Sequence, residues 1–313
     1  MGCYNENKLK DDSKSYIIAE FEIKEENVNK ETKIINSFEL FQKENEFDSI
    51  KNEINNEKEI MEKCQISINN EAIPFAYYHK FDQAGTYTIK YEFIGKMSKI
   101  HYMFHGCESL ISIDFSHFDA KNVSNMSFLL SCCESLKNVL GLSVFDSKTI
   151  TNLAGMFCTC SNLKNINLSN FNTENVTHME AMFCECKSLT ELDLSGYKTK
   201  NVINMSLMFD LCKSLTNVNL SGFDTQNVTD MNHMFNDCES LTKIDLSDFN
   251  TQKTTNMGGM FRLCKSLTNL NLSHFNLQNI KNNDGIFEGC DALRKENVMA
   301  EDQKIFELLE KNH

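Results

Sequence analysis

Cysteine is the residue type in this sequence with the greatest capacity for chemistry, and many of the cysteines are regularly spaced. The chain has 313 residues, of which 13 are cysteine. Eight cysteines each follow, by three residues, an apolar slot that holds phenylalanine in seven cases and Leu130 in one: Cys107, Cys133, Cys160, Cys186, Cys212, Cys238, Cys264 and Cys290. Catalysis needs one special position, and a buried cysteine behaves as a small hydrophobe. Eight equivalent positions on an apolar face therefore predict a structural cysteine ladder.

Six cysteines gather in three neighbouring repeats and allow other interpretations. They are Cys132, Cys133, Cys158, Cys160, Cys184 and Cys186. Zinc prefers four ligands in a tetrahedron, whereas equivalent positions in stacked coils form a line. Inert packing is thus the first expectation, so we assign no metal ligands. A metal site or a redox-sensitive thiol cluster is the alternative.

The composition narrows the classes of function. The formal net charge of −13 argues against nucleic acid as a partner, because phosphate binding needs clustered Lys and Arg. The first residues, MGCYNENKLK, lack the apolar segment of a secretory signal. These features predict a reducing, cytoplasmic setting with free thiols. Without a fixed catalytic constellation or a glycine-rich phosphate loop, we expect neither an enzyme nor a cofactor.

The slots define a repeat whose successive spacings are 26, 27, 26, 26, 26, 26 and 26 residues. In LTKIDLSDF (residues 241–249), apolar and polar residues alternate as on a strand. In NVTDMNHMFNDC (residues 227–238), apolar residues recur in steps of three and four, which predicts a short helix. We therefore expect residues 98–293 to form an α/β repeat solenoid of eight strand-turn-helix coils with a parallel sheet.

Two outward columns on the expected strands are the candidate partner-binding residues. One column holds Asp114, Asn167, Asp193, Asn219, Asp245 and Asn271, and the column before it includes Glu191, Asn217, Lys243 and Asn269. Varied side chains on a regular frame are the means by which solenoids recognise proteins. The alternative is that these residues only solvate the sheet and tie the coils together.

The ends of the chain do not repeat. Residues 1–97 predict a small α+β domain that caps the first coil, with strands at 15–23 and 85–93, a hairpin through Asn69 and Asn70, and a helix over 45–64. Residues 294–313 predict a C-terminal capping helix. Both caps are expected because an uncovered apolar coil aggregates.

The first residues contain a lipidation candidate. Gly2 followed by Cys3 is typical of proteins that carry myristate on glycine and palmitate on cysteine, and two chains anchor a protein stably. The sixth position is Glu6, where the usual pattern has Ser or Thr. Peripheral membrane association is thus one expectation, and an ordinary flexible terminus is the other.

The segment SLTELDLSGYKTKNVINMSLMFDLC, residues 188–212, resembles the BspA-like leucine-rich repeat. That family occurs in surface proteins of bacteria and unicellular eukaryotes. The resemblance implies a leucine-rich-repeat solenoid, a role in adhesion or protein binding, and no catalytic residues. This chain departs from the general repeat by placing aromatics where Asn or Cys is usual: Phe118, Phe145, Phe171, Tyr197, Phe223, Phe249 and Phe275.

Two functional hypotheses follow from these features. The first is a protein-binding scaffold in the cytoplasm, tethered to a membrane through Gly2 and Cys3. The second, implied by the resemblance, is a cell-surface adhesin. A thiol or metal sensor built on the clustered cysteines is a minor third.

Overall fold

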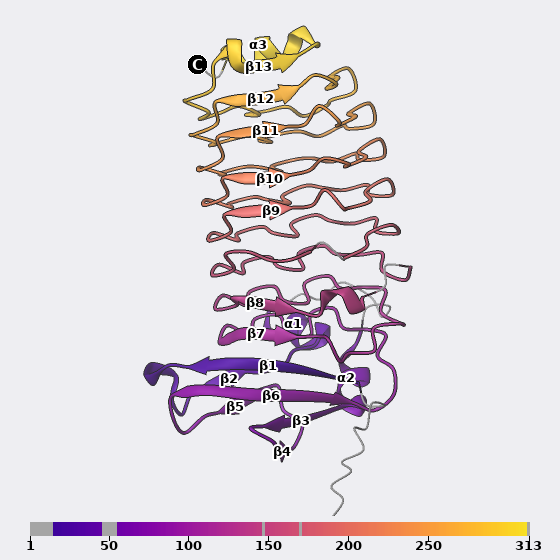
Figure 1. Ribbon diagram of the computed structural model, residues 1–313, viewed down its shortest axis with the longest axis vertical. Helices are drawn as coiled ribbons and strands as arrows, with labels where there is room; N and C mark the ends of the chain where they lie inside the picture. Colours follow the sequence, from indigo (N-terminus) through magenta and orange to yellow (C-terminus); the bar gives the residue numbers. More distant parts are fainter. Residues whose placement is uncertain (1–14, 46–54, 146–147, 169–170, 312–313) are drawn as a thin grey trace, which may run out of the picture.

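The structure, a computed structural model, describes residues 15–45, 55–145, 148–168 and 171–311. It is an elongated stack with a sheet-rich N-terminal part at one end and the C-terminal helix at the other (Figure 1). Between them lies a β-solenoid of about seven turns within the described residues. Isolated parallel bridges join neighbouring coils from Lys99 to Asn282.

The N-terminal part is built around two long antiparallel strands, β1 (Ser15–Ile23) and β6 (Gly85–Phe93), which occupy the two segments predicted as strands. The predicted hairpin is β3 (Cys64–Ile68) and β4 (Glu71–Ile73), whose turn residues Asn69 and Asn70 have φ of 48° and 70°. Asparagine tolerates this left-handed backbone better than most residues, so the turn fixes the register. The remaining elements are the 3₁₀ helix Glu25–Asn27, β2 (Glu31–Lys33), α1 (Phe38–Glu44), α2 (Glu57–Lys63) and β5 (Tyr78–Lys80).

Strand β1 joins the N-terminal part to the solenoid. One edge of β1 pairs with β6, and the other pairs antiparallel with β7 (Leu110–Asp114) of the first coil. Strand β7 then pairs in parallel with β8 (Asn138–Leu140), which gives one six-stranded sheet in the order β4-β3-β6-β1-β7-β8. The edge of the first coil is therefore covered by a strand of opposite direction.

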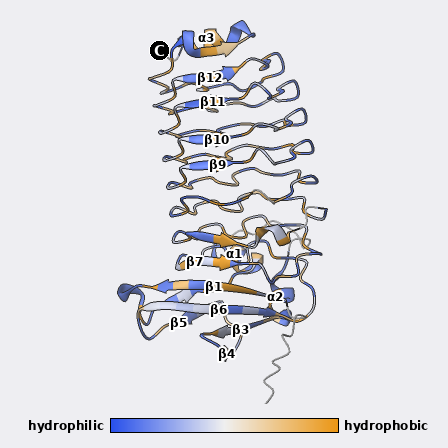
Figure 2. Ribbon diagram, viewed as in Figure 1, coloured by the Kyte–Doolittle hydropathy of each residue, from blue (hydrophilic) through white to orange (hydrophobic). Residues whose placement is uncertain are grey.

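Later coils contribute short parallel strands to the same side of the stack. They are β9 (Glu191–Asp193), β10 (Asn217–Asn219), β11 (Lys243–Asp245) and β12 (Asn269–Leu272). Strand β13 (Val298–Ala300) pairs with β12 after a short 3₁₀ helix (Lys295–Asn297), and helix α3 (Gln303–Lys311) ends the described chain. Figure 2 shows β9 to β12 mostly in the colours of hydrophilic residues.

The prediction of a short helix in each repeat is wrong, because each coil described has a ladder of tight turns there. Along residues 231–238 the odd-numbered N–H groups donate to the next coil, as Phe235 N does to Met260 O at 2.9 Å. The intervening N–H groups close turns within the coil. His233 and Asp237 have φ of 53° and 55°, and left-handed residues every four positions interrupt an α-helix. Bonds to the neighbouring coil thus replace the bonds of the expected helix.

The solenoid core contains two columns of aromatic rings. The slot residues Phe157, Phe183, Phe209, Phe235, Phe261 and Phe287 stack with ring centroids 5.3 to 5.9 Å apart. The second column runs from Phe171 through Tyr197 to Phe275, with centroids 6.2 to 6.5 Å apart. The slot column has no ring at Leu130, which lies between Phe104 and Phe157 in the sequence.

The coil with the 27-residue spacing absorbs its extra residue locally. Gly141 has φ of 74° and precedes a 3₁₀ helix, Leu142–Val144, whose first residue is buried. A Cβ at Gly141 would lie 2.2 Å from the backbone nitrogen of Ser116 in the preceding coil. Only glycine therefore fits this backbone at this distance.

Candidate functional site

The strand side of the solenoid brings the predicted partner-binding residues onto one face. Glu191 lies beside Asn217 and Lys243 beside Asn269, each as partners in neighbouring parallel strands. Eight of the ten predicted residues are exposed, and Asp114 and Asn271 are half-buried. The resulting surface is a polar strip that follows the long axis of the stack.

The second column of this face also has a local structural task. The Oδ1 atoms of Asp114, Asp193, Asn219, Asp245 and Asn271 accept a hydrogen bond from the N–H two residues later, at 2.8 to 3.2 Å. Such Asx turns reverse the chain after a strand. The bond from Ser195 N lowers the pKa of Asp193. The side chains of the first column are less involved in such turns. Their charge changes from negative at Glu191 to positive at Lys243.

The eight ladder cysteines lie inside the solenoid. Each of them is at most 2% exposed. From the second coil onward, each Sγ donates to the carbonyl of the slot residue in the preceding coil, as Cys238 does to Phe209 O at 3.2 Å. Burial raises the pKa of the Cys238 thiol well above its ordinary value. These groups are positioned as packed, neutral hydrogen-bond donors.

The six clustered cysteines separate into two sets. Cys133, Cys160 and Cys186 belong to the buried ladder, whereas Cys132, Cys158 and Cys184 are half-buried and lie outside it. Within residues 15–45, 55–145, 148–168 and 171–311, no three His, Cys, Asp or Glu side chains are grouped so that they could hold a metal ion. The six sulfurs are therefore divided between the buried ladder and a second, half-buried set.

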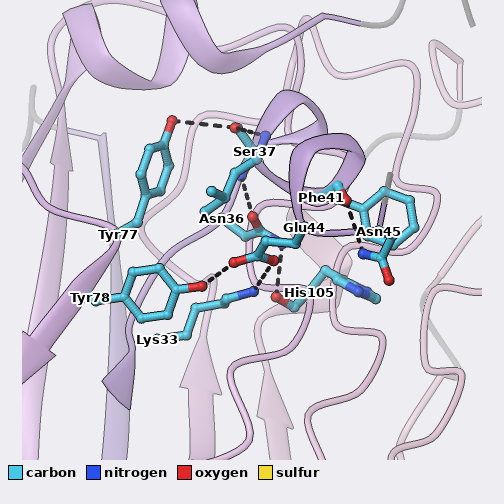
Figure 3. A network of polar contacts seen from close by, with 10 residues as sticks. Lys33, Asn36, Ser37, Phe41, Glu44, Asn45, Tyr77, Tyr78 and His105 are labelled. Carbon is cyan, nitrogen blue, oxygen red and sulfur yellow. Dashed lines mark hydrogen bonds and ion pairs between the residues drawn. The ribbon is translucent and has the colours of Figure 1, made fainter. Parts of the chain in front are cut away.

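A polar pocket that the sequence did not predict lies where the N-terminal part meets the first two coils. It has a volume of about 480 Å³, and its lining includes Lys33 of β2, Glu44 of α1, Tyr78 of β5, His105 and Cys132. In Figure 3 the Glu44 carboxylate lies between the Lys33 ammonium, at 2.6 Å, and the Tyr78 hydroxyl, which donates to it.

Burial and neighbouring charges shift the titration of the pocket groups. Burial alone would raise the pKa of Glu44, but the hydrogen bonds from Lys33 and Tyr78 hold it below its ordinary value. Burial, assisted by Lys33, lowers the pKa of His105 to about 4. The buried Nδ1 of His105 has no hydrogen-bond partner. At neutral pH the pocket therefore combines an ionised carboxylate with a neutral imidazole.

No spacing in the sequence indicates this pocket. Lys33, Glu44 and Tyr78 lie in the non-repeating part, at different distances along the chain from His105. His105 does occupy the repeat position directly after the phenylalanine slot, where Ser131, Cys158 and Asp210 stand in later coils. The residue type at this position varies from coil to coil, and this variation alone does not indicate a pocket.

Acidification should destabilise the protein through His105. The folded pKa of about 4 lies below the unfolded value of about 6.5, so the unfolded chain binds the proton more readily between these values. This contribution to stability is present above pH 6.5 and is lost as the pH falls toward 4. Between pH 7 and pH 5 the loss should be about 2 kcal/mol. Urea unfolding at both pH values measures it.

His105→Asn is the matched control for this prediction, because asparagine keeps a polar side chain without titrating in this range. The variant should lose about 2 kcal/mol less than the wild type on the same pH change. Equal losses in the two proteins would show that His105 is not the responsible group.

Two kinds of membrane association can be considered for this chain, a spanning helix and acylation near the N-terminus. Among the residues described, no helix is long and apolar enough to cross a bilayer. Gly2 and Cys3 lie outside the described residues, so their acylation stays a prediction.

The comparison with protein families gives a match over most of the chain. A family model described as "Mycoplasma protein of unknown function, DUF285" matches residues 75–144, 98–209 and 185–300. No curated protein matches the sequence. The match and the repeat solenoid are together consistent with a BspA-like repeat protein. The chain belongs to the family of Mycoplasma proteins of unknown function, DUF285.

Proposed function

We propose that this protein is a non-enzymatic binding solenoid whose strand face holds a protein partner. The repeat solenoid and the family match fit a protein-interaction role. The repeated thiols support a non-enzymatic assignment, because they are buried and donate to backbone carbonyls. The net charge of −13 favours a protein over a nucleic acid as the partner.

One observation carries the choice of face: the first exposed column presents different side chains at equivalent, in-register positions. Glu191, Asn217, Lys243 and Asn269 occupy the first position of β9 to β12 and are exposed. Neighbouring strands lie about 4.8 Å apart, so these side chains form a regularly spaced strip whose charge changes from strand to strand. An extended or flat protein surface with complementary charges fits such a strip.

The second column supports recognition more weakly. Asp193, Asn219 and Asp245 each commit one side-chain oxygen to an Asx turn. Their side chains are exposed and contribute to the polar surface that a partner would meet. We therefore propose that the first column distinguishes one partner from another, and that the second column determines the shape of the face.

We place this function in the cytoplasm, with acylation of Gly2 and Cys3 as the means of holding the solenoid at a membrane. A cell-surface adhesin is the alternative that the resemblance implies. Both settings use the same strand face.

A photo-crosslinking amino acid at Asn217 tests the face. In cells that express the full chain, it should give a discrete higher-mass adduct with a partner. The same amino acid at Gln252, which is exposed on the second turn after β11, should give little. Lys243→Glu should lower the Asn217 adduct about fivefold, because it reverses a charge next to the crosslinker. A stronger adduct at Gln252, or no effect of the reversal, would refute the strand face as the binding surface.

A further inference from the structure

Two of the half-buried thiols are brought to equivalent positions in neighbouring coils. Cys158 and Cys184 each directly follow the phenylalanine slot of their coil. Backbone bonds on both sides of Cys158 hold the register: Phe157 N donates to Met182 O at 2.9 Å and Thr159 N to Cys184 O at 2.7 Å. The two side chains therefore project side by side from adjacent rungs of one ladder.

A carboxylate lies beside the second of these thiols. The pKa values of Cys158 and Cys184 depend on each other, as those of neighbouring thiols do. The Cys184 Sγ is also 3.8 Å from Oδ2 of Asp210, the equivalent residue of the next coil. Cys184 thus lies between a second thiol and a carboxylate that can accept its proton.

This juxtaposition distinguishes the pair from the other described cysteines. The nine cysteines at positions 64, 107, 133, 160, 186, 212, 238, 264 and 290 are buried. Cys132 is half-buried, but it stands one position further along its coil, bonds the Ser131 hydroxyl at 3.7 Å and lines the polar pocket. Among the described residues, only Cys158 and Cys184 are half-buried cysteines at the same position of adjacent coils.

We propose that Cys158 and Cys184 form a redox-active dithiol site, which a hydroperoxide oxidises to a disulfide between adjacent coils. The Cys158 thiolate attacks the peroxide oxygen, so that an S–O bond forms, the O–O bond breaks and hydroxide leaves, which takes up the proton that the Cys158 thiol released. The Cys184 sulfur then attacks the sulfenic sulfur and displaces the hydroxyl group. The Cys184 proton passes, through Asp210, to the departing hydroxide as water. Two thiols and one hydrogen peroxide thereby give one disulfide and two waters.

Geometry and acidity both support this chemistry. Adjacent strands lie about 4.8 Å apart, within the range of about 4.4 to 6.8 Å between the Cα atoms of disulfide-bonded cysteines. The neighbouring Cys184 thiol lowers the pKa of Cys158, against the opposing effect of burial and of Glu185 and Asp210. The thiolate is the attacking species, so a lowered pKa favours the first step.

Intact mass and peptide mapping of the full chain test the site. The reduced protein, treated with stoichiometric hydrogen peroxide at pH 7, should lose the mass of two hydrogen atoms and yield a linked peptide pair containing Cys158 and Cys184. Cys158→Ser and Cys184→Ser should abolish the linkage, whereas Cys132→Ser should retain it. Serine suits this column because Ser131 occupies it in another coil, and thermal unfolding of each variant checks folding.

Two further measurements separate juxtaposition from reactivity. Phenylarsine oxide bridges two close thiols, so it should add once to the wild type and to Cys132→Ser but not to either of the other serine variants. Asp210→Asn should slow disulfide formation about tenfold if the carboxylate receives the proton.

Three results would overturn the proposal. The first is a linkage that persists without Cys158 or Cys184. The second is oxygen uptake at Cys158 with no linkage in the wild type. The third is the absence of the arsenical adduct from the wild type.

Discussion

Phe235→Ala should lower the free energy of unfolding by about 4 kcal/mol. Phe235 is fully buried, and its ring stacks between those of Phe209 and Phe261. The distances between ring centroids are 5.3 Å to Phe209 and 5.8 Å to Phe261. Removing the ring leaves a cavity at the junction of two coils and interrupts the aromatic column on both sides. Because each coil contacts only its neighbours, the rest of the stack cannot close around the gap.

Phe235→Leu is the matched control, because Leu130 occupies the same slot in the second coil. This variant should lose only about 1 kcal/mol, since most of the buried volume remains. Urea unfolding gives the free energies, and amide hydrogen exchange shows where protection falls. For Phe235→Ala the loss of protection should centre on residues 209–261. A uniform loss along the whole chain would contradict the nearest-neighbour explanation.

Gly141→Ala should destabilise the protein by about 3 kcal/mol, through a left-handed backbone and a steric clash together. Gly141 has φ of 74°, and an added Cβ would lie 2.2 Å from Ser116 N and 2.7 Å from Phe115 C. These are backbone atoms of the preceding coil, so no side-chain rotation relieves the contact. The two coils must separate locally.

Gly95→Ala separates the two causes. Gly95 has a similar φ of 78°, but a Cβ there meets nothing within 4 Å. Gly95→Ala should lower the free energy of unfolding by about 1 kcal/mol, which is the cost of the left-handed backbone without a steric clash. Thermal and urea unfolding of both variants measure the difference. If the two variants lost equal stability, the close approach of the coils at Gly141 would not be the cause.

The repeat and its strands could be predicted because their signals are local and repeated. The alternation around Ile244 and Leu246 fixes which side chains face inward, and the same alternation recurs in the other coils except the second, which departs from it at Leu140 and Gly141. The hairpin at Asn69 and Asn70 was predictable from the conformational tolerance of asparagine.

The helix was predicted wrongly because a second backbone conformation gives the same spacing of apolar residues. Leu207 and Leu211 lie four residues apart and both have φ of 59°. A chain with left-handed residues at this spacing also directs apolar side chains inward in steps of three and four. The choice depends on whether neighbouring coils accept the backbone hydrogen bonds, and this is a property of the stack rather than of one repeat.

The sites could also be predicted only as far as local sequence patterns determine them. The strand-face column could be listed from the sequence, because alternation alone places it outside. The burial of Cys160 was predicted, because it follows the phenylalanine slot by three residues as the other ladder cysteines do. The juxtaposition of Cys158 and Cys184 depends on the turn ladder and could not be predicted. The contact of Glu44 with Lys33 and Tyr78 arises from the packing of three N-terminal elements, for which the repeat gives no guide.

The coils are stacked along the long axis of the molecule (Figure 1). Backbone bonds that join one coil to the next, such as Phe235 N to Met260 O, therefore run along that axis. Tension applied between the N-terminal sheet and α3 would therefore pull on these bonds along their own length rather than in shear. Such a stack gives way at one junction at a time, and every freed residue adds roughly 3.4 Å of contour length. Under load the protein would behave as an extensible tether, which lengthens by whole coils while the coils that remain closed keep their surface unchanged.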